Sequence, residues 1–167
     1  ARSFLRKNGG TSSGAGNFNS SSNNNNNNNN NFLFAAACTN TLVTPGATRD
    51  GSAHVAYNSD GQSLYGFMTH LPAADHPPGT MREIYEFTSG RYLGAIPEAA
   101  HTCNVIGNQN EHQLVIAETT FDGLPALANQ HGAILDYYSL MWVTLQRART
   151  AREAISLMNN LTRKLGH

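Results

Sequence analysis

Short runs of alternating hydrophobic and polar residues occupy the middle of the chain, and turn-forming residues separate them. Such runs, bounded by Gly, Pro, Asn and Asp, are typical of strands. They predict strands at 41–44, 53–57, 83–87, 92–94, 103–107 and 114–117. Turn signals at 45–46 and 50–51 separate the first two runs, so we expect a hairpin whose far end returns towards Cys38. The proline-rich stretch 72–78 is expected to form a loop.

The hydrophobic period changes in the last third of the chain. Apolar residues recur at helical spacing over 137–148 and again over 151–165, which predicts two helices. Thr150 and Glu153 match a capping box at the start of the second helix, and Gly166 is a suitable stop. Strands followed by helices predict an α+β fold, in which the helices cover one face of an antiparallel sheet.

Residues 1–37 have a different composition from the rest of the chain. They include an unbroken asparagine tract at 23–31, which cannot bury enough apolar area to offset its chain entropy, so we expect disorder. A short apolar run follows the tract and ends with Ala35 and Ala37 immediately before Cys38. Small residues at these two positions match the rule for signal peptidase, so we interpret this run as a signal-like or propeptide-like segment. The alternative is that the run packs on the domain as a first strand.

Composition excludes several classes of function. Lys plus Arg and Asp plus Glu both number 11, so no basic surface for nucleic acid is expected. No apolar run is long enough to span a membrane. The seven histidines show no metal-ligand spacing, and neither a metal site nor another cofactor is predicted. The two cysteines are too few for a disulfide scaffold, although secretion would allow a bridge between Cys38 and Cys103. Asn19 and Asn160 begin glycosylation sequons.

Cys38 is the candidate for chemistry. A thiolate is strongly nucleophilic, but a base must first remove the thiol proton. When cysteine is the first residue of a mature chain, its own α-amine, with a pKa of about 8, can be that base. Cys38 follows directly after three alanines and is therefore placed to become a new N-terminus. On composition alone, a small buried core cysteine is the simpler interpretation.

Three blocks of sequence instead favour a catalytic role for Cys38. They read C-T-N-T-L-V-T-P-G-A-T-R-D-G-S at 38–52 with Y-N-S-D at 57–60, then V-I-G-N-Q-N-E-H-Q-L-V-I-A-E-T-T-F at 105–121, then R-A-R-T-A-R-E-A-I at 147–155. In this order they resemble the dipeptidase A family, which consists of secernin-related cysteine peptidases with an N-terminal nucleophile. The resemblance extends over 38–167 and implies an αββα sandwich, of which the chain would contain the N-terminal part: antiparallel strands followed by two helices.

The resemblance also implies roles for individual residues. Cys38 would attack the peptide carbonyl after autocatalytic or signal-type processing, and Asp60 would orient its free α-amine. The backbone N–H of Thr120 would supply one donor to the oxyanion hole, where one donor typically contributes ~10²–10³ in rate. Tyr57 stands where related acylases have an arginine. Tyr57 and Asn58 are candidates for binding the substrate.

Two further residues of the second block are interpreted from their surroundings. Asn110 precedes a predicted tight turn beside the site and is a third candidate for binding substrate. Glu118 follows a predicted strand and is expected to pair with Arg82 or Arg91, which would make its role structural.

These observations predict a thiol-dependent dipeptidase that hydrolyses short peptides through an acyl-enzyme on Cys38. The alternatives are an N-acyl amide hydrolase of the same superfamily and a non-catalytic, secernin-like scaffold. The sequence does not decide between a monomer and a homo-oligomer. The protein would be secreted or vesicular if the segment before Cys38 is a signal peptide, and cytoplasmic otherwise. Because the second oxyanion-hole asparagine of the family is expected beyond this sequence, we expect the fragment alone to be inactive.

Overall fold

A computed structural model describes residues 38–59, 68–87, 89–119, 124 and 130–166. The predicted disorder and signal-like character of residues 1–37 lie outside the described residues. Two predicted site residues, Asp60 and Thr120, lie outside them as well. All of the described residues belong to one compact unit that begins at Ala35.

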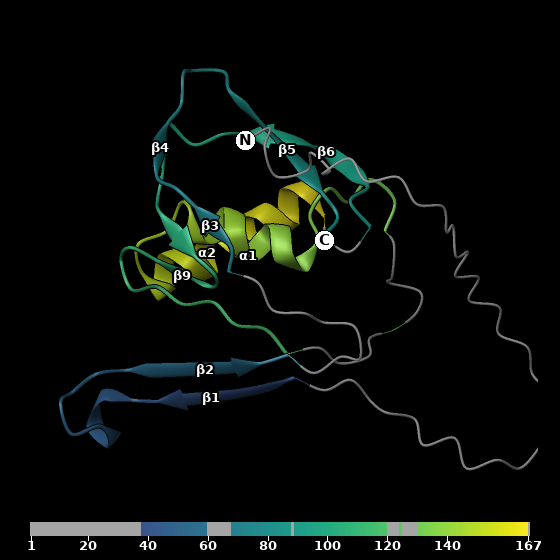
Figure 1. Ribbon diagram of the computed structural model, residues 1–167. Coiled ribbons are helices and arrows are strands. Elements are labelled where there is room, and N and C mark those ends of the chain that lie inside the picture. The colour runs from purple at the N-terminus through teal and green to yellow at the C-terminus, as the bar shows by residue number, and fades with distance from the viewer. Residues whose placement is uncertain (1–37, 60–67, 88, 120–123, 125–129, 167) are drawn as a thin grey trace, which may run out of the picture. The chain divides into compact units, whose positions relative to one another are not determined.

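Nine short strands and a 3₁₀ turn occupy the described part of the chain before the helices (Figure 1). They are β1 (Thr39–Val43), η1 (Pro45–Ala47), β2 (His54–Asn58), β3 (His70–Leu71), β4 (Ala74–Asp75), β5 (Met81–Tyr85), β6 (Tyr92–Pro97), β7 (His101–Thr102), β8 (Val105–Ile106) and β9 (Gln109–Asn110). The strand pairs β1–β2, β3–β8, β8–β9, β4–β7 and β5–β6 are all antiparallel. Together with two helices they confirm the predicted α+β class.

The predicted first hairpin is confirmed. β1 and β2 pair in a regular register from Thr39 opposite Asn58 to Val43 opposite His54. The connection turns through η1 and through Gly51, whose φ of 75° suits glycine. The hairpin therefore places the residue before Thr39 close to the end of β2.

Two predictions about strands are wrong. Residues 114–117 form only an isolated bridge, between Gln109 and Val115, because the chain turns tightly just before them. In that turn Asn110 N donates to Leu114 O (3.0 Å) and Leu114 N donates to Asn110 Oδ1 (3.1 Å). The run 103–107 is also shorter than predicted, because Cys103 N donates to the helix-end carbonyl of Gln146 (2.8 Å) and not to a neighbouring strand. Conversely, the proline-rich stretch predicted as a loop contributes β4.

The two predicted helices are present as α1 (Tyr137–Leu145) and α2 (Ala151–Leu165). The predicted capping box of α2 is confirmed, with Thr150 and Glu153 bonded to each other's backbone N–H groups. Gly166 ends this helix with a φ of 70°, as predicted. None of the described helices has the length and apolar character that crossing a bilayer requires.

The helices pack against the strands through two apolar clusters. The first joins the β5–β6 hairpin to both helices and contains Ile84, Ile96, Leu135, Leu140, Val143 and Leu161. The second lies where β8 and the following turn meet the C-terminal end of α1, and it contains Val105, Leu114, Leu145, Ala148 and Ala154. Figure 1 shows α1 and α2 side by side, and they are in direct contact. These clusters form the scaffold on which the polar sites described below are built.

Polar contacts also hold the scaffold together. Glu98 accepts from Arg147 Nη2 at 2.8 Å and lies 3.5 Å from Arg82 Nη1, so one carboxylate bridges two arginines. All three side chains are largely buried, with exposed fractions of 7%, 15% and 20% for Glu98, Arg147 and Arg82. Arg82 also donates to Gln146, so the cluster ties β5 to the end of α1.

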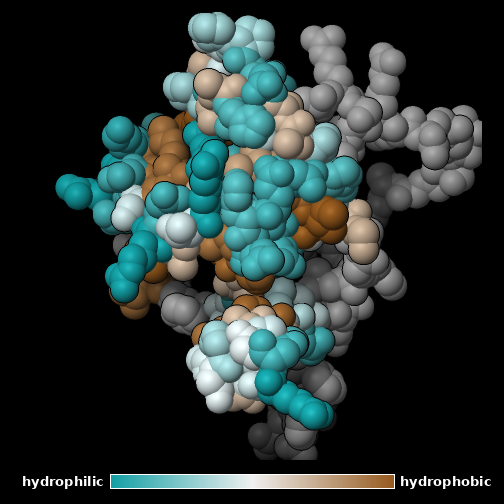
Figure 2. Space-filling model, turned by 90° about the vertical axis from the view of Figure 1, so that its left-hand side faces the viewer, coloured by the Kyte–Doolittle hydropathy of each residue, from teal (hydrophilic) through white to brown (hydrophobic). Residues whose placement is uncertain are grey.

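Hydrophobic residues reach the surface as well. On the face in Figure 2, hydrophobic areas are interspersed with hydrophilic ones. Among the exposed large side chains are Leu42 and Val55, at 70% and 41%, which lie directly opposite each other in the β1–β2 hairpin. The hairpin therefore depends mainly on backbone pairing and on the polar contacts near its open end.

Candidate functional site

The thiol of Cys38 lies at the open end of the β1–β2 hairpin. Its side chain is half-buried and forms no disulfide. The Sγ atom lies 3.7 Å from Glu118 Oε1, to which it can donate, and 3.9 Å from the hydroxyl of Tyr57. Because β1 and β2 pair antiparallel, Tyr57 comes beside Cys38 although it lies 19 residues further along the chain. The hairpin therefore forms one side of a small polar site around the thiol.

Glu118 is the centre of this site. The hydroxyl of Tyr57 donates to Glu118 Oε1 at 2.5 Å, so one carboxylate oxygen faces both the phenol and the thiol. Asn40 of β1 holds the same segment in place: its Nδ2 donates to Glu118 O (2.7 Å) and to Thr119 Oγ1 (2.5 Å). Two hydrogen bonds from β1 thus hold the backbone segment of Glu118, and one from β2 holds its carboxylate beside Cys38.

The tyrosines around the carboxylate stay protonated at neutral pH. Burial, reinforced by the hydrogen bond to Glu118, raises the pKa of Tyr57 well above its ordinary value. Burial and the nearby charge of Glu118 also raise the pKa of Tyr138. Burial, followed by the neighbouring Tyr138 and Glu118, raises the pKa of Tyr137 to about 12. These phenols can therefore donate hydrogen bonds throughout the neutral range but cannot serve as bases there.

The arrangement provides a thiol, a carboxylate acceptor and phenol donors within hydrogen-bonding reach. A carboxylate beside a thiol does not favour the thiolate by charge, since like charges repel. It can instead orient the S–H bond or accept its proton. The phenol of Tyr57 remains a donor that can stabilise negative charge on Glu118. The site thus has the groups for thiol-based nucleophilic chemistry assisted by a proton acceptor.

The structure brings together some of the residues predicted from the sequence. Cys38 and Tyr57 are in contact, and Asn58 pairs with Thr39, the residue next to Cys38. Asn110 is different: it is 4% exposed, its Nδ2 donates to the carbonyls of Leu145 (2.8 Å) and Ala148 (2.7 Å), and its Oδ1 accepts from two backbone N–H groups. The described contacts of Asn110 are those of a structural residue in the core.

The interpretation of Glu118 as the partner of an arginine is wrong. Arg82 contacts Glu98, and Arg91 lies 3.7 Å from Glu86. Glu118 instead faces Tyr57 and Cys38, from 61 and 80 positions away along the chain. The sequence block that contains Glu118 indicates the family, but a carboxylate after an apolar run does not indicate which distant residue it will contact.

A cysteine beside a carboxylate has groups that nucleophilic chemistry can use, but an α+β fold alone does not assign an activity. The family model of Peptidase family C69 matches residues 37–167, which is more than half of the chain, and the chain belongs to this family. The protein is therefore a peptidase, a hydrolase that acts on peptide bonds, and its substrates are peptides. The predicted relationship to the dipeptidase A family is confirmed. No curated protein and no solved structure matches the chain.

Proposed function

We propose that the protein is a cysteine-type dipeptidase that cleaves short peptides through an acyl-enzyme on Cys38. The observation that carries this proposal is the position of the Cys38 thiol, half-buried at the open end of the hairpin and 3.7 Å from Glu118 Oε1. Membership in a peptidase family supports it, because the match begins at residue 37, next to this cysteine. We further infer that the described strands and helices belong to an αββα sandwich.

The proposed reaction begins with release of the α-amine of Cys38 by cleavage of the bond to Ala37. The amine removes the thiol proton, and the thiolate attacks the peptide carbonyl carbon to form a tetrahedral intermediate. The backbone N–H of Thr120 would stabilise the oxyanion. The amine then returns its proton to the leaving nitrogen, which leaves a thioester on Cys38. Water hydrolyses this thioester and regenerates the thiol.

Glu118 and Tyr57 would act as positioning residues in this reaction. Before cleavage the carboxylate accepts from the phenol and from the thiol, which holds Sγ at the open end of the hairpin. In the processed enzyme the single S–H proton would go to the α-amine, and Glu118 would keep its bond from Tyr57. Asp60 would hold the ammonium form of the α-amine, while Tyr57 and Asn58 at the end of β2 would line the space that a substrate enters. This division separates the proton acceptor, the α-amine, from the group that orients the nucleophile.

Determination of the mature N-terminus tests the processing step. Edman sequencing and intact mass of the active enzyme are expected to find Cys38 as the first residue. A variant with Ala37→Pro, which disfavours cleavage at this bond, is expected to stay unprocessed and inactive, and Ala35→Ser serves as its control. Active enzyme with an intact bond between Ala37 and Cys38 would contradict the proposed mechanism.

Substrate profiling distinguishes a dipeptidase from the alternative amide hydrolase. A panel of dipeptides, longer peptides and N-acyl amino acids would be incubated with the same preparation, and products would be quantified by mass spectrometry. We expect the highest kcat/KM with dipeptides. Preferred cleavage of N-acyl amides would assign the protein to the other activity, and the absence of hydrolysis together with an unprocessed N-terminus would indicate a non-catalytic scaffold.

Substitutions at the carboxylate test its positioning role. We expect Glu118→Gln to lower kcat ~10-fold to ~100-fold with little change in KM, because a neutral amide is a weaker acceptor than the carboxylate that positions Cys38 and Tyr57 before proton transfer, while substrate contacts remain. Tyr57→Phe should have a smaller effect in the same direction. The alkaline and acidic limbs of the pH–kcat profile should shift in Glu118→Gln, whereas a merely structural role would lower activity equally at all pH values. Glu83→Gln is the matched control, because Glu83 is an exposed glutamate that also accepts from a tyrosine hydroxyl, that of Tyr85 (2.8 Å), and it makes no contact with Cys38 among those of the described residues.

A further inference from the structure

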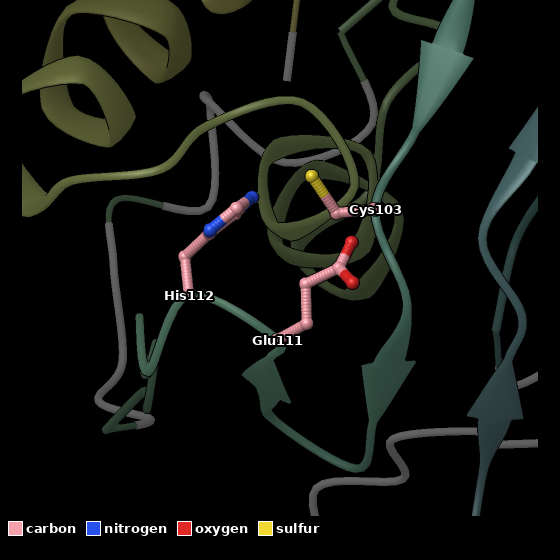
Figure 3. A group of neighbouring side chains, drawn as sticks. All are labelled: Cys103, Glu111 and His112. Carbon is pink, nitrogen blue, oxygen red and sulfur yellow. The ribbon is translucent and has the colours of Figure 1, made fainter.

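A second group of reactive side chains lies outside the Cys38 site. The ligand atoms of Cys103, Glu111 and His112 all lie within 4.8 Å of one another. Figure 3 shows the three side chains directed towards a common space, with Cys103 from one segment and the two other residues from the turn after β9. Cys103 is buried, at 5% exposure, while Glu111 and His112 are exposed. Nothing in the proposed peptidase mechanism uses these residues.

The backbone around these side chains is firmly held. Glu111 N donates to Asn104 O at 3.0 Å, and Asn104 N donates to Glu111 Oε1 at 3.1 Å, so the two segments are joined at the group itself. His112 N donates to the buried Oδ1 of Asn110 at 3.0 Å. A hydrogen bond to one oxygen of a carboxylate is the kind of contact that orients metal-binding carboxylates in proteins. The donors therefore need only side-chain rotation to converge.

We propose that Cys103, Glu111 and His112 bind a divalent transition-metal ion of the zinc class. A thiolate, an imidazole and a carboxylate form a ligand set that suits Zn²⁺ and Co²⁺, and that Mg²⁺ or Ca²⁺, which prefer oxygen ligands, would not favour. Bonds of ~2.0–2.3 Å would bring the ligand atoms somewhat closer together than they are now. The exposed side chains of Glu111 and His112 can make this movement, and three protein ligands leave a fourth position for water.

Metal binding at this site would release a proton. Formation of the sulfur–metal bond breaks the S–H bond of Cys103, and the proton passes to solvent.

Metal titration of the full chain tests the site directly. Zn²⁺ affinity would be measured by competition with a chromogenic chelator, and Co²⁺ would report thiolate ligation through its charge-transfer absorption. We expect saturable binding of one ion per chain with a thiolate–Co²⁺ band. Cys103→Ala should abolish the band, and both Cys103→Ala and His112→Gln should weaken Zn²⁺ binding ~100-fold or more, since each removes one of three ligands.

Two variants serve as matched controls. His101→Gln removes an exposed histidine of β7 that pairs with Asp75, and Cys38→Ala removes the other thiol of the described chain. Both should bind Zn²⁺ as the parent does. Because His112 is exposed, His112→Gln should keep the fold and gives an answer even if Cys103→Ala unfolds. Absence of saturable binding at micromolar Zn²⁺, or loss of binding in Cys38→Ala in place of His112→Gln, would overturn the proposal.

Discussion

Replacement of Cys38 by alanine is expected to reduce kcat/KM for a dipeptide substrate by ~10⁴-fold or more, since loss of a covalent nucleophile leaves only binding and oxyanion stabilisation. The same variant should lose labelling by a thiol-directed probe that mimics a peptide. Cys38→Ser should also be severely impaired, because a serine hydroxyl is a much weaker nucleophile than a thiolate when the base is an amine. Steady-state kinetics and gel-based labelling of the processed enzyme measure both effects.

Thr41→Ala is the matched control for this prediction. Thr41 is an exposed residue of β1, the strand that follows Cys38. Its side chain points to the opposite face of the strand from that of Asn40. It should retain both hydrolysis and labelling. Hydrolysis by Cys38→Ala at a rate within ~10-fold of the parent enzyme would show that another group is the nucleophile.

The largest effect on stability is expected at Glu98. Glu98→Ala should lower the free energy of unfolding by ~3–5 kcal/mol, because it leaves the guanidinium groups of Arg82 and Arg147 largely buried without a counter-charge. Urea denaturation followed by circular dichroism measures this change. Glu86→Ala provides the control: its pair with Arg91 is much less buried, with side-chain exposures of 34% for Glu86 and 66% for Arg91, so its removal should cost ~1 kcal/mol or less. Equal losses in the two variants would contradict this interpretation of the cluster.

The same cluster should make stability fall in acid. Burial alone would raise the pKa of Glu98, but the hydrogen bonds from Ala99 N and Arg147 and the charge of Arg82 outweigh burial, so the pKa lies below its ordinary value. A carboxyl group with a lowered pKa in the folded state stabilises the protein above the pKa of the unfolded chain. That stabilisation is lost as pH falls below the ordinary glutamate range and through the lowered pKa. Glu98→Ala should therefore show a weaker acid dependence than the parent.

The features that could be predicted from the sequence are those with local causes. The α2 helix was predicted at both ends because a capping box, a helical period and a terminal glycine all lie within or beside it. The first hairpin was predicted for the same reason, since turn residues separate two strand-like runs. Two-residue strands such as β3 and β4 have no period that a pattern could reveal, and they exist because long-range partners pair with them.

The residues of the candidate site also fall into two groups: those whose placement has a local cause and those placed by distant partners. The closeness of Cys38 to the end of β2, where Tyr57 lies, follows from a hairpin that local turn signals predict. The contacts of Glu118 could not be predicted, because its partners lie 61 and 80 positions away along the chain and a carboxylate most commonly pairs with an arginine or a lysine. The substrate-binding role of Asn110 stays a prediction. Its side chain donates to the carbonyls of Leu145 and Ala148, and no local pattern indicates these contacts because they depend on the position of α1.

The exposed pair of Leu42 and Val55 has a consequence for the motions of the protein. A hairpin with little apolar burial can open locally at a lower free-energy cost than the helical core, without global unfolding. Such an opening would separate Cys38 from Glu118 while α1 and α2 stay packed. In the proposed mechanism, the hydrogen bonds from Asn40 to Glu118 and Thr119 would favour the closed hairpin, in which Cys38 lies beside Glu118. A peptide that contacts both strands would raise the population of this closed state further.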